Sequence, residues 1–191
     1  MRRTYTSPFT GVTSIVYMNL AELEYEKLVE EIDNEKFEME QRRQQEKTYP
    51  PAALESLSGT ENFTEGAIKH IFNGEINTRG KAVGYHYEGI EPTDGCTILG
   101  TKTVHDRNGV YEAQVSVNGV AKRGGSTFFP REWSPQQVVN AVNKAYENRY
   151  HVPPQPNRYE GTLPSGLKIQ MYLNDGRPPK IRSAFPIKEP T

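Results

Sequence analysis

The sequence TVHDRNGVYEAQVSVNGVAK, residues 103–122, holds the clearest β-strand pattern in the chain. Two Asn-Gly pairs, at 108–109 and 118–119, flank a run in which polar and apolar side chains alternate. Asn-Gly is a favoured pair for tight hairpin turns, and alternation is typical of a strand with one buried face. The segment therefore predicts an antiparallel hairpin with a shared apolar face made by Tyr111, Ala113, Val115 and Val117.

Further alternating runs lie on both sides of this segment. VGYHYEGI at 83–90, GLKIQMYLNDG at 166–176 and PKIRSAFPI at 179–187 each predict a strand. Because short strands with turn residues between them favour antiparallel pairing, we expect an α+β fold with antiparallel β-sheets and packed helices.

Two helices are expected within this body. In residues 133–150, Ser134 is the expected N-cap, Pro135 suits the first turn, and one apolar face is formed by Val138, Val139, Val142, Ala145 and Tyr146. A shorter helix through GAIKHIF, residues 66–72, is expected to be capped by Thr64 and ended by Gly74.

The N-terminal part of the chain has a different texture. Residues 19–47 lack Gly and Pro and begin at Asn19, a good N-cap, so we expect a helix that precedes the body. Its apolar stripe is thin and its polar faces are wide, which indicates a solvated surface or a face against a partner protein. Pro50 and Pro51 end it, and we divide the chain into a helical segment with linker at 1–60 and a body at 61–191.

Composition narrows the class of protein. Residues 1–60 carry eleven acidic against seven basic side chains, and 61–191 carry thirteen against sixteen, a weak sign of a body that meets a polyanion. The single cysteine, Cys96, excludes an internal disulfide and any zinc site built on several thiolates. No apolar run approaches the roughly 20 residues that span a bilayer, and the start lacks an ordinary secretion signal, so we expect a soluble protein.

Two of the four histidines are candidates for catalysis. His70 and His86 stand sixteen positions apart, and two imidazoles can run acid and base chemistry together near neutral pH. Gly84 allows a close approach of backbone or ligand, and Tyr87 beside His86 is a candidate wall for a base or sugar. Spacing alone leaves a structural role for both histidines open, and for His105 and His151 we expect no catalytic role.

Several motifs in order resemble the bacterial branch of the EndoU endoribonucleases, a group often found as toxin domains of polymorphic effectors. They cover roughly residues 65–187 and are, in order, HIFNGEIN, GKAVGYHYEG, GVYEAQVSVNG, STFFPREWSPQQVVNAVNKAY and SAFPI. The resemblance implies an EndoU or ribonuclease A-like fold and cleavage of RNA by attack of a ribose 2'-OH, which leaves a 2',3'-cyclic phosphate. It places the acid and base roles on His70 and His86, with His86 favoured as the base.

The resemblance also implies further site residues. The family's third catalytic position is often a lysine, whereas the corresponding stretch GGSTFFP offers Thr127 as the catalytic group and Ser126 as a substrate contact. Lys122, four residues earlier, is assigned to substrate binding. Near the C-terminus the family's tyrosine is replaced by Phe185, which we expect to stack on a nucleobase while Ser183 binds the base edge.

Partners and location follow from the resemblance in the same way. It implies RNA as substrate, with tRNA one candidate, a cognate immunity protein, no membrane, and action in a bacterial cytoplasm after delivery as a secreted effector. It implies no cofactor and no metal-ligating residues, with cleavage either metal-independent or stimulated by manganese.

Three alternatives stay open. The histidines could hold zinc or manganese together with Glu75 or Glu88, although no metal-binding spacing such as HExxH is present. The same cleft could instead be a binding module for RNA or protein without catalysis. The charged helix at 19–47 raises a third class, protein interaction.

Overall fold

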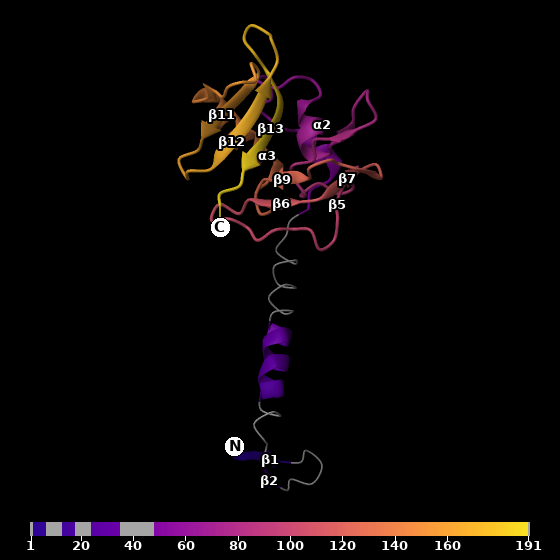
Figure 1. The fold of residues 1–191 in the computed structure, drawn as a ribbon, viewed down its shortest axis with the longest axis vertical. Helices are drawn as coiled ribbons and strands as arrows, with labels where there is room; N and C mark the ends of the chain where they lie inside the picture. Colours follow the sequence, from indigo (N-terminus) through magenta and orange to yellow (C-terminus); the bar gives the residue numbers. More distant parts are fainter. Residues whose placement is uncertain (1, 7–12, 18–23, 35–47, 191) are drawn as a thin grey trace. The chain divides into compact units, whose positions relative to one another are not determined.

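A computed structural model describes residues 2–6, 13–17, 24–34 and 48–190, and the chain divides into two compact units, Met1–Gln45 and Glu46–Thr191. The first unit contains an antiparallel pair of strands that is not predicted from the sequence, β1 (Arg2–Thr6) and β2 (Thr13–Tyr17). The helix predicted over 19–47 is present at 24–34 (Figure 1), and its other residues lie outside the described ones.

The two units divide after residue 45, whereas the boundary predicted from the sequence lies after residue 60. Residues 48–60 belong with the body because they bond and pack there. The Tyr49 N–H donates to the Gly89 carbonyl, and the Tyr49 carbonyl accepts from the Glu91 N–H. Leu54, in the short 3-10 helix η1 (Pro51–Leu54), and Leu57 both pack against the main hydrophobic core.

The body is built around a four-stranded antiparallel sheet of C-terminal strands. Its order is β10 (Tyr150–His151), β11 (Arg158–Thr162), β12 (Lys168–Leu173) and β13 (Ile181–Ile187). Helix α3 (Pro135–Glu147) packs against β11 and β12 (Figure 1). The strands predicted at 166–176 and 179–187 are confirmed, and the core between helix and sheet includes Val138, Val142, Ala145, Ile169, Met171 and Ile181.

The start of α3 agrees with its sequence signal. The Ser134 side chain accepts a hydrogen bond from the Gln137 backbone N–H, and the Gln137 side chain accepts one from the Ser134 backbone N–H. Pro135 occupies the first turn, where no N–H is needed. This reciprocal capping satisfies two otherwise unpaired donors and fixes where the helix begins.

Three small sheets make up the other half of the body. One pairs β3 (Glu75–Ile76) with β4 (Ala82–Val83), and another pairs β6 (Tyr111–Ala113) with β9 (Ser126–Phe128). In the third, β7 (Val115–Val117) lies between β5 (Gly95–Thr97) and β8 (Val120–Ala121). The hairpin at Asn118–Gly119 is confirmed, with Val117 opposite Val120 and both turn residues at positive φ. The alternating side chains of β6 and β7 bury a second core cluster of Tyr111, Ala113, Val115 and Val117 with Tyr85 and Phe128.

Two local predictions need correction. Helix α2 (Ala67–Phe72) begins after Gly66 without a side-chain cap, and Thr64 contributes its backbone carbonyl to the Ala67 N–H. The alternating run at 83–90 is a strand only at Val83, because Gly84 and Tyr85 adopt positive φ values of 76° and 61° and turn the backbone away.

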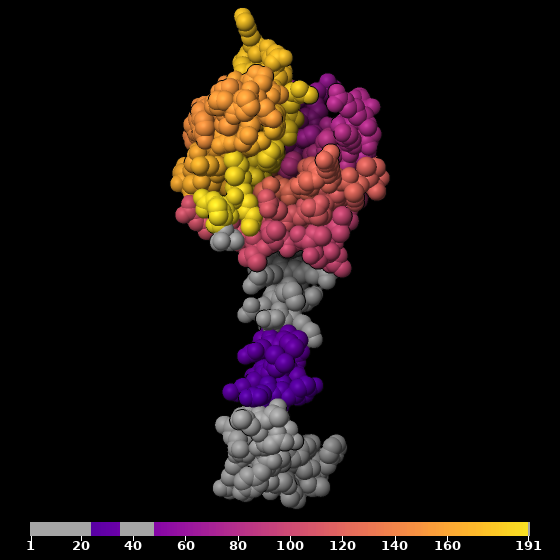
Figure 2. All heavy atoms as spheres, in the orientation of Figure 1, coloured from indigo at the N-terminus to yellow at the C-terminus, as the bar shows by residue number. Residues whose placement is uncertain are grey.

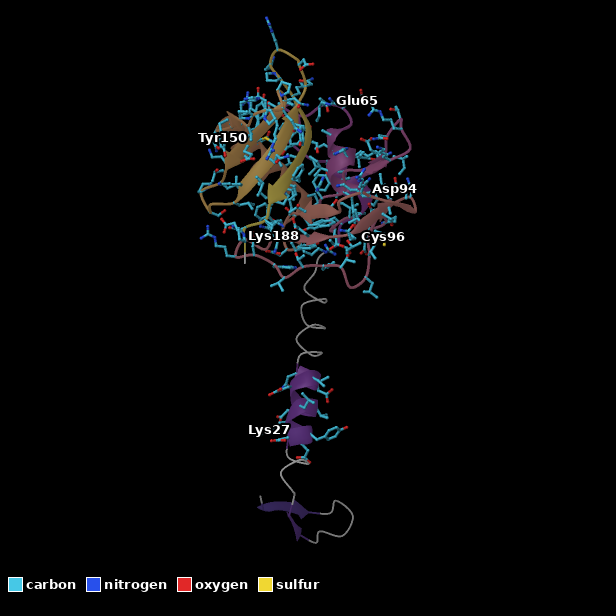
Figure 3. All side chains as sticks on the ribbon, in the orientation of Figure 1. Lys27, Glu65, Asp94, Cys96, Tyr150 and Lys188 are labelled. Atoms are coloured by element: carbon cyan, nitrogen blue, oxygen red, sulfur yellow. The ribbon has the colours of Figure 1, made fainter. Side chains whose placement is uncertain are left out.

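Cys96, the single cysteine of the sequence, is exposed on β5 (Figure 3). In the described part of the chain, none of the helices is both long enough and apolar enough to cross a membrane.

Candidate active site

The end of α2 and the turn at Gly84 bring His70 and His86 together. The Tyr85 N–H donates to the His70 carbonyl at 2.9 Å, and the His86 N–H donates to the Ile71 carbonyl at 2.7 Å. A Cβ atom on Gly84 would lie 2.0 Å from the His70 carbonyl oxygen, so only glycine permits this approach. The two imidazole rings are consequently 6.4 Å apart, centroid to centroid.

His86 is held as a neutral imidazole with a defined tautomer. Its ring is buried, and Nδ1 lies 2.9 Å from the Thr127 carbonyl oxygen. A carbonyl can only accept, so Nδ1 carries a hydrogen, and in the neutral ring Nε2 then keeps a lone pair. Burial, reinforced by the positive charge of Lys122, holds the pKa of His86 well below its usual value. The ring of Phe185 stacks on it with centroids 4.9 Å apart.

His70 has a different polar partner. Its Nδ1 lies 3.0 Å from the Glu75 Oε1, and its side chain is 17% exposed, against 42% for Glu75. The ionised carboxylate accepts the Nδ1 hydrogen, which leaves Nε2 free to hold or release a second proton. The two histidines therefore differ in the way an acid and base pair requires: one is neutral and buried, and the other is paired with an anion.

Lys122 lies beside this pair. Its Nζ donates to the Gly84 carbonyl at 2.8 Å and to the Ser126 Oγ at 2.7 Å, and the Ser126 hydroxyl donates to the same carbonyl at 3.2 Å. Burial lowers the pKa of Lys122 to about 8. Nζ makes no other hydrogen bond with the described residues, so the third hydrogen of the ammonium is available to a ligand.

These residues line one cleft of about 910 Å³ between the C-terminal sheet and the smaller sheets. Figure 2 shows its furrow between the yellow β13 region and the purple and salmon surface beside it. Seven of the eight predicted site residues line it, namely His70, His86, Lys122, Ser126, Thr127, Ser183 and Phe185.

Tyr87 is the exception. It is completely buried, packs edge to face on Phe72 with centroids 5.4 Å apart, and donates its hydroxyl to the Trp133 carbonyl. It cannot form a wall for a base or sugar, and the alternation on which that prediction rests is broken by the turn at Gly84 and Tyr85. The tyrosine that lines the cleft is instead Tyr172 on β12. It could be assigned to the site only once β12 is known to pair with β13.

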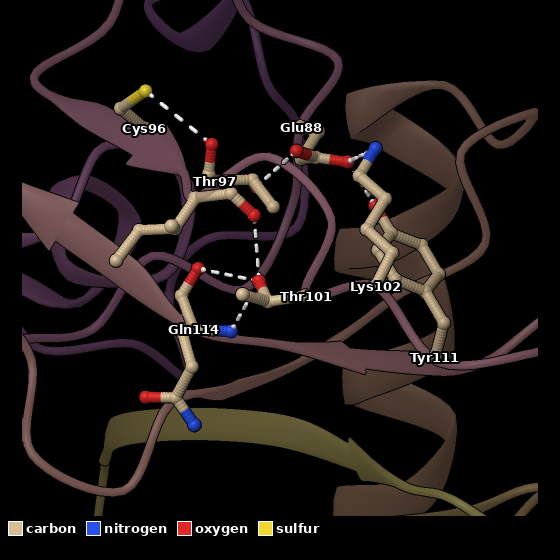
Figure 4. A network of polar contacts seen from close by, with 8 residues as sticks. Glu88, Cys96, Thr97, Thr101, Lys102, Tyr111 and Gln114 are labelled. Carbon is tan, nitrogen blue, oxygen red and sulfur yellow. Dashed lines mark hydrogen bonds and ion pairs between the residues drawn. The ribbon is translucent and has the colours of Figure 1, made fainter.

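The two glutamates considered as metal ligands both make polar contacts with other side chains. Glu75 contacts His70, whereas Glu88 binds Lys102, with 2.6 Å between Lys102 Nζ and Glu88 Oε2, and accepts hydrogen bonds from the hydroxyls of Thr97 and Tyr111 (Figure 4). Over the described residues, no group of three or more His, Cys, Asp or Glu side chains is arranged to hold a metal ion.

Comparisons with known proteins agree with this arrangement. A family model described as bacterial EndoU nuclease matches residues 64–188. A protein named "Toxin" from Bacillus cereus is 47% identical over 136 residues, which are 70% of this chain and 24% of that protein. The chain thus spans about a quarter of the length of this relative. No solved structure matches the present chain.

Proposed function

The chain belongs to the bacterial EndoU nuclease family, and from this we propose that it is an endoribonuclease that cleaves by transesterification at the ribose 2'-OH. The observation that carries the proposal is the pairing of a buried neutral His86 with a carboxylate-bound His70 at 6.4 Å. Two imidazoles in different protonation states can take one proton and give another in the same step.

In the proposed reaction, Nε2 of His86 takes the proton of the 2'-OH, because Nδ1 already donates to the Thr127 carbonyl. The 2'-oxygen attacks the adjacent phosphorus, and the bond from phosphorus to the 5'-oxygen breaks. Protonated His70 gives its Nε2 proton to that leaving oxygen. The products are a 2',3'-cyclic phosphate and a free 5'-OH, and the two histidines finish with their protonation states exchanged.

Lys122 supplies the positive charge that this step needs. Negative charge grows on the phosphorane oxygens, and an ammonium with one free N–H can stabilise it more strongly than a hydroxyl. The Ser126 hydroxyl is engaged by Lys122 and the Gly84 carbonyl, so we assign it the role of positioning Lys122. Thr127, which also lines the cleft, is then a neutral donor that assists, and Lys122 takes the third catalytic role.

The base side of the cleft is proposed to be formed by Ser183 and Phe185. One face of Phe185 already stacks on His86, so a nucleobase would extend that stack from the other side. The reaction draws on side chains alone, and we propose that it needs no cofactor, with manganese at most a stimulant.

The relative named "Toxin" supports a biological setting. We propose that the chain acts as a toxic nuclease in a bacterial cytoplasm after delivery as a secreted effector, with RNA, including tRNA, as its substrate. A cognate immunity protein that covers the cleft is the partner we propose.

The test is cleavage of a mixed RNA pool by the purified chain in EDTA. We expect products with cyclic phosphate ends, lost in His70→Ala and in His86→Ala and kept in His151→Ala, whose imidazole is exposed outside the cleft. Fluorescence of Trp133, the one tryptophan, checks that each variant is folded. RNA binding without cleavage would favour a binding module, and cleavage abolished by EDTA would favour a metal site.

A further inference from the structure

A second hollow of about 460 Å³ continues from the catalytic cleft. The two share Thr64, Asn157 and Arg182 as lining residues, so a ligand can pass from one to the other over these side chains. None of the motifs that carry the resemblance contains a residue that lines this hollow, and the proposed chemistry at His70 and His86 does not use it.

A β-bulge aims Arg182 at this junction. Tyr172 on β12 pairs with Ser183 on β13, but the next residue, Leu173, pairs with Ile181, so Arg182 has no partner across the ladder. Ile181 is completely buried on the core side, whereas the consecutive residues Arg182 and Ser183 both line the cleft. In a regular strand neighbours point to opposite faces, and a bulge next to a site is the usual means of re-aiming a side chain.

The chemistry of the hollow favours a phosphate group over a base. Arg182 is exposed, and its guanidinium makes no hydrogen bond or ion pair with any other described residue. Thr64 and Asn157 add neutral side chains that can donate hydrogen bonds. None of the described residues lining the hollow is aromatic, so it offers no platform on which a base could stack.

We propose that this hollow is a subsite for the phosphodiester of a nucleotide adjacent to the one that is cut, with Arg182 as its principal ligand. The inference rests on the proposed ribonuclease function and extends it to a strand of at least two phosphates. The planar guanidinium suits a phosphate with two parallel hydrogen bonds. Asp175 also lines the hollow, and its carboxylate opposes an anion there.

The test uses a short RNA with one cleavable ribose, at the base selected in the pool experiment, and 2'-O-methyl groups elsewhere. Two further substrates carry a neutral methylphosphonate at the phosphate on the 5' or the 3' side of the cut. For the full chain we expect kcat/KM to fall about tenfold on one of these neutral substrates, since a charge-assisted bond is lost. The kcat/KM of Arg182→Gln on the parent RNA should be about tenfold below that of the wild type. It should fall no further on that neutral substrate.

Two matched variants sharpen the result. Arg177→Gln removes a charge from an exposed position of the preceding loop, outside both hollows, and should cleave the parent RNA as the wild type does. Asp175→Asn should cleave it faster. The slope of log kcat/KM against log salt should flatten by about 0.7 in Arg182→Gln, as for one phosphate contact on a single strand.

The outcomes separate the two proposals. Parent RNA cut equally well by Arg182→Gln and the wild type would overturn the subsite, as would equal losses in both proteins on every neutral substrate. Parent RNA left intact by the wild type would overturn the proposed function itself.

Discussion

Replacing Gly84 with alanine tests whether the turn that joins the two histidines is required for both stability and catalysis. Gly84 has φ +76°, and an added Cβ would lie 2.0 Å from the carbonyl oxygen of His70 and 3.1 Å from its Cγ. Real Cβ contacts essentially never fall under 3.0 Å. The backbone at 84–86 therefore has to move away from α2 by about 1 Å, a shift that in an active site costs roughly 100-fold in rate.

The cost in stability has two parts. A left-handed alanine costs roughly 1–2 kcal/mol. The displacement also weakens the bond from the Tyr85 N–H to the His70 carbonyl, a contribution of about 0.5–1.5 kcal/mol. We expect Gly84→Ala to lower the free energy of unfolding by roughly 1.5–3.5 kcal/mol, a large share of the roughly 5–15 kcal/mol of a typical domain.

Gly80→Ala is the matched control. Gly80 has φ +69°, but a Cβ there meets nothing within 4 Å, so this variant carries the left-handed cost without the clash. Unfolding in guanidinium, followed by Trp133 fluorescence, gives both free energies, and RNA cleavage at a temperature where both variants are folded gives both rates. Equal destabilisation of the two variants, together with full activity of Gly84→Ala, would refute the reasoning.

Three further predictions concern charge. Because the pKa of His86 is lowered in the folded state, the unfolded chain binds a proton below about pH 6.5 that the folded chain does not. The free energy of unfolding should therefore fall as pH drops from 6.5, by up to about 1.4 kcal/mol per unit, and His86→Gln should lack this part of the slope in urea titrations; identical slopes would contradict it. Lys122, with its pKa lowered to about 8, should lose its charge above that pH. Lys122→Gln should stay folded and cleave RNA roughly 100- to 1000-fold more slowly than the wild type at pH 7. An unchanged rate would remove Lys122 from the mechanism. Glu88→Ala should lower the free energy of unfolding by about 2–3 kcal/mol without slowing RNA cleavage by the folded protein. The control Glu147→Ala breaks an exposed pair with Lys144 and should lower it by at most about 0.5 kcal/mol. Similar losses in the two variants would show that the Glu88 network is not structural.

Signals that act within a few residues could be predicted from the sequence. The Asn118–Gly119 hairpin needs positive φ at both positions, and the Ser134–Gln137 capping box closes within four residues, so the chain itself contains both partners. The apolar face of α3 and the alternation of β6 and β7 are likewise properties of single elements. Motif resemblance then added the cleft residues without any knowledge of their contacts.

Contacts between distant elements could not be predicted in the same way. The run VGYHYEGI alternates like a strand, but the carbonyl of His70 draws the Tyr85 N–H into a turn, and this bond is invisible until α2 is placed. Tyr87 packs on Phe72 and bonds the Trp133 carbonyl, two further contacts between distant elements that bury it. Residues 48–60 are assigned to a linker from the sequence because Pro50 and Pro51 end the preceding helix, and nothing in the sequence indicates the backbone bonds of Tyr49 to Gly89 and Glu91.

The mispredicted strand at 83–90 and the geometry of the site share one physical cause. A strand with a strict period of two presents only every second residue to a cleft. The turn at Gly84 interrupts one run and brings His86 to His70, and the bulge at Arg182 interrupts another and turns two consecutive side chains inward. Lys122 reaches the cleft from the end of β8, just before positive φ at Gly124 and Gly125 returns the chain to β9. Sequence periodicity therefore fails at the positions where the backbone departs from regular pairing, and those departures bring residues of the proposed site into one cleft.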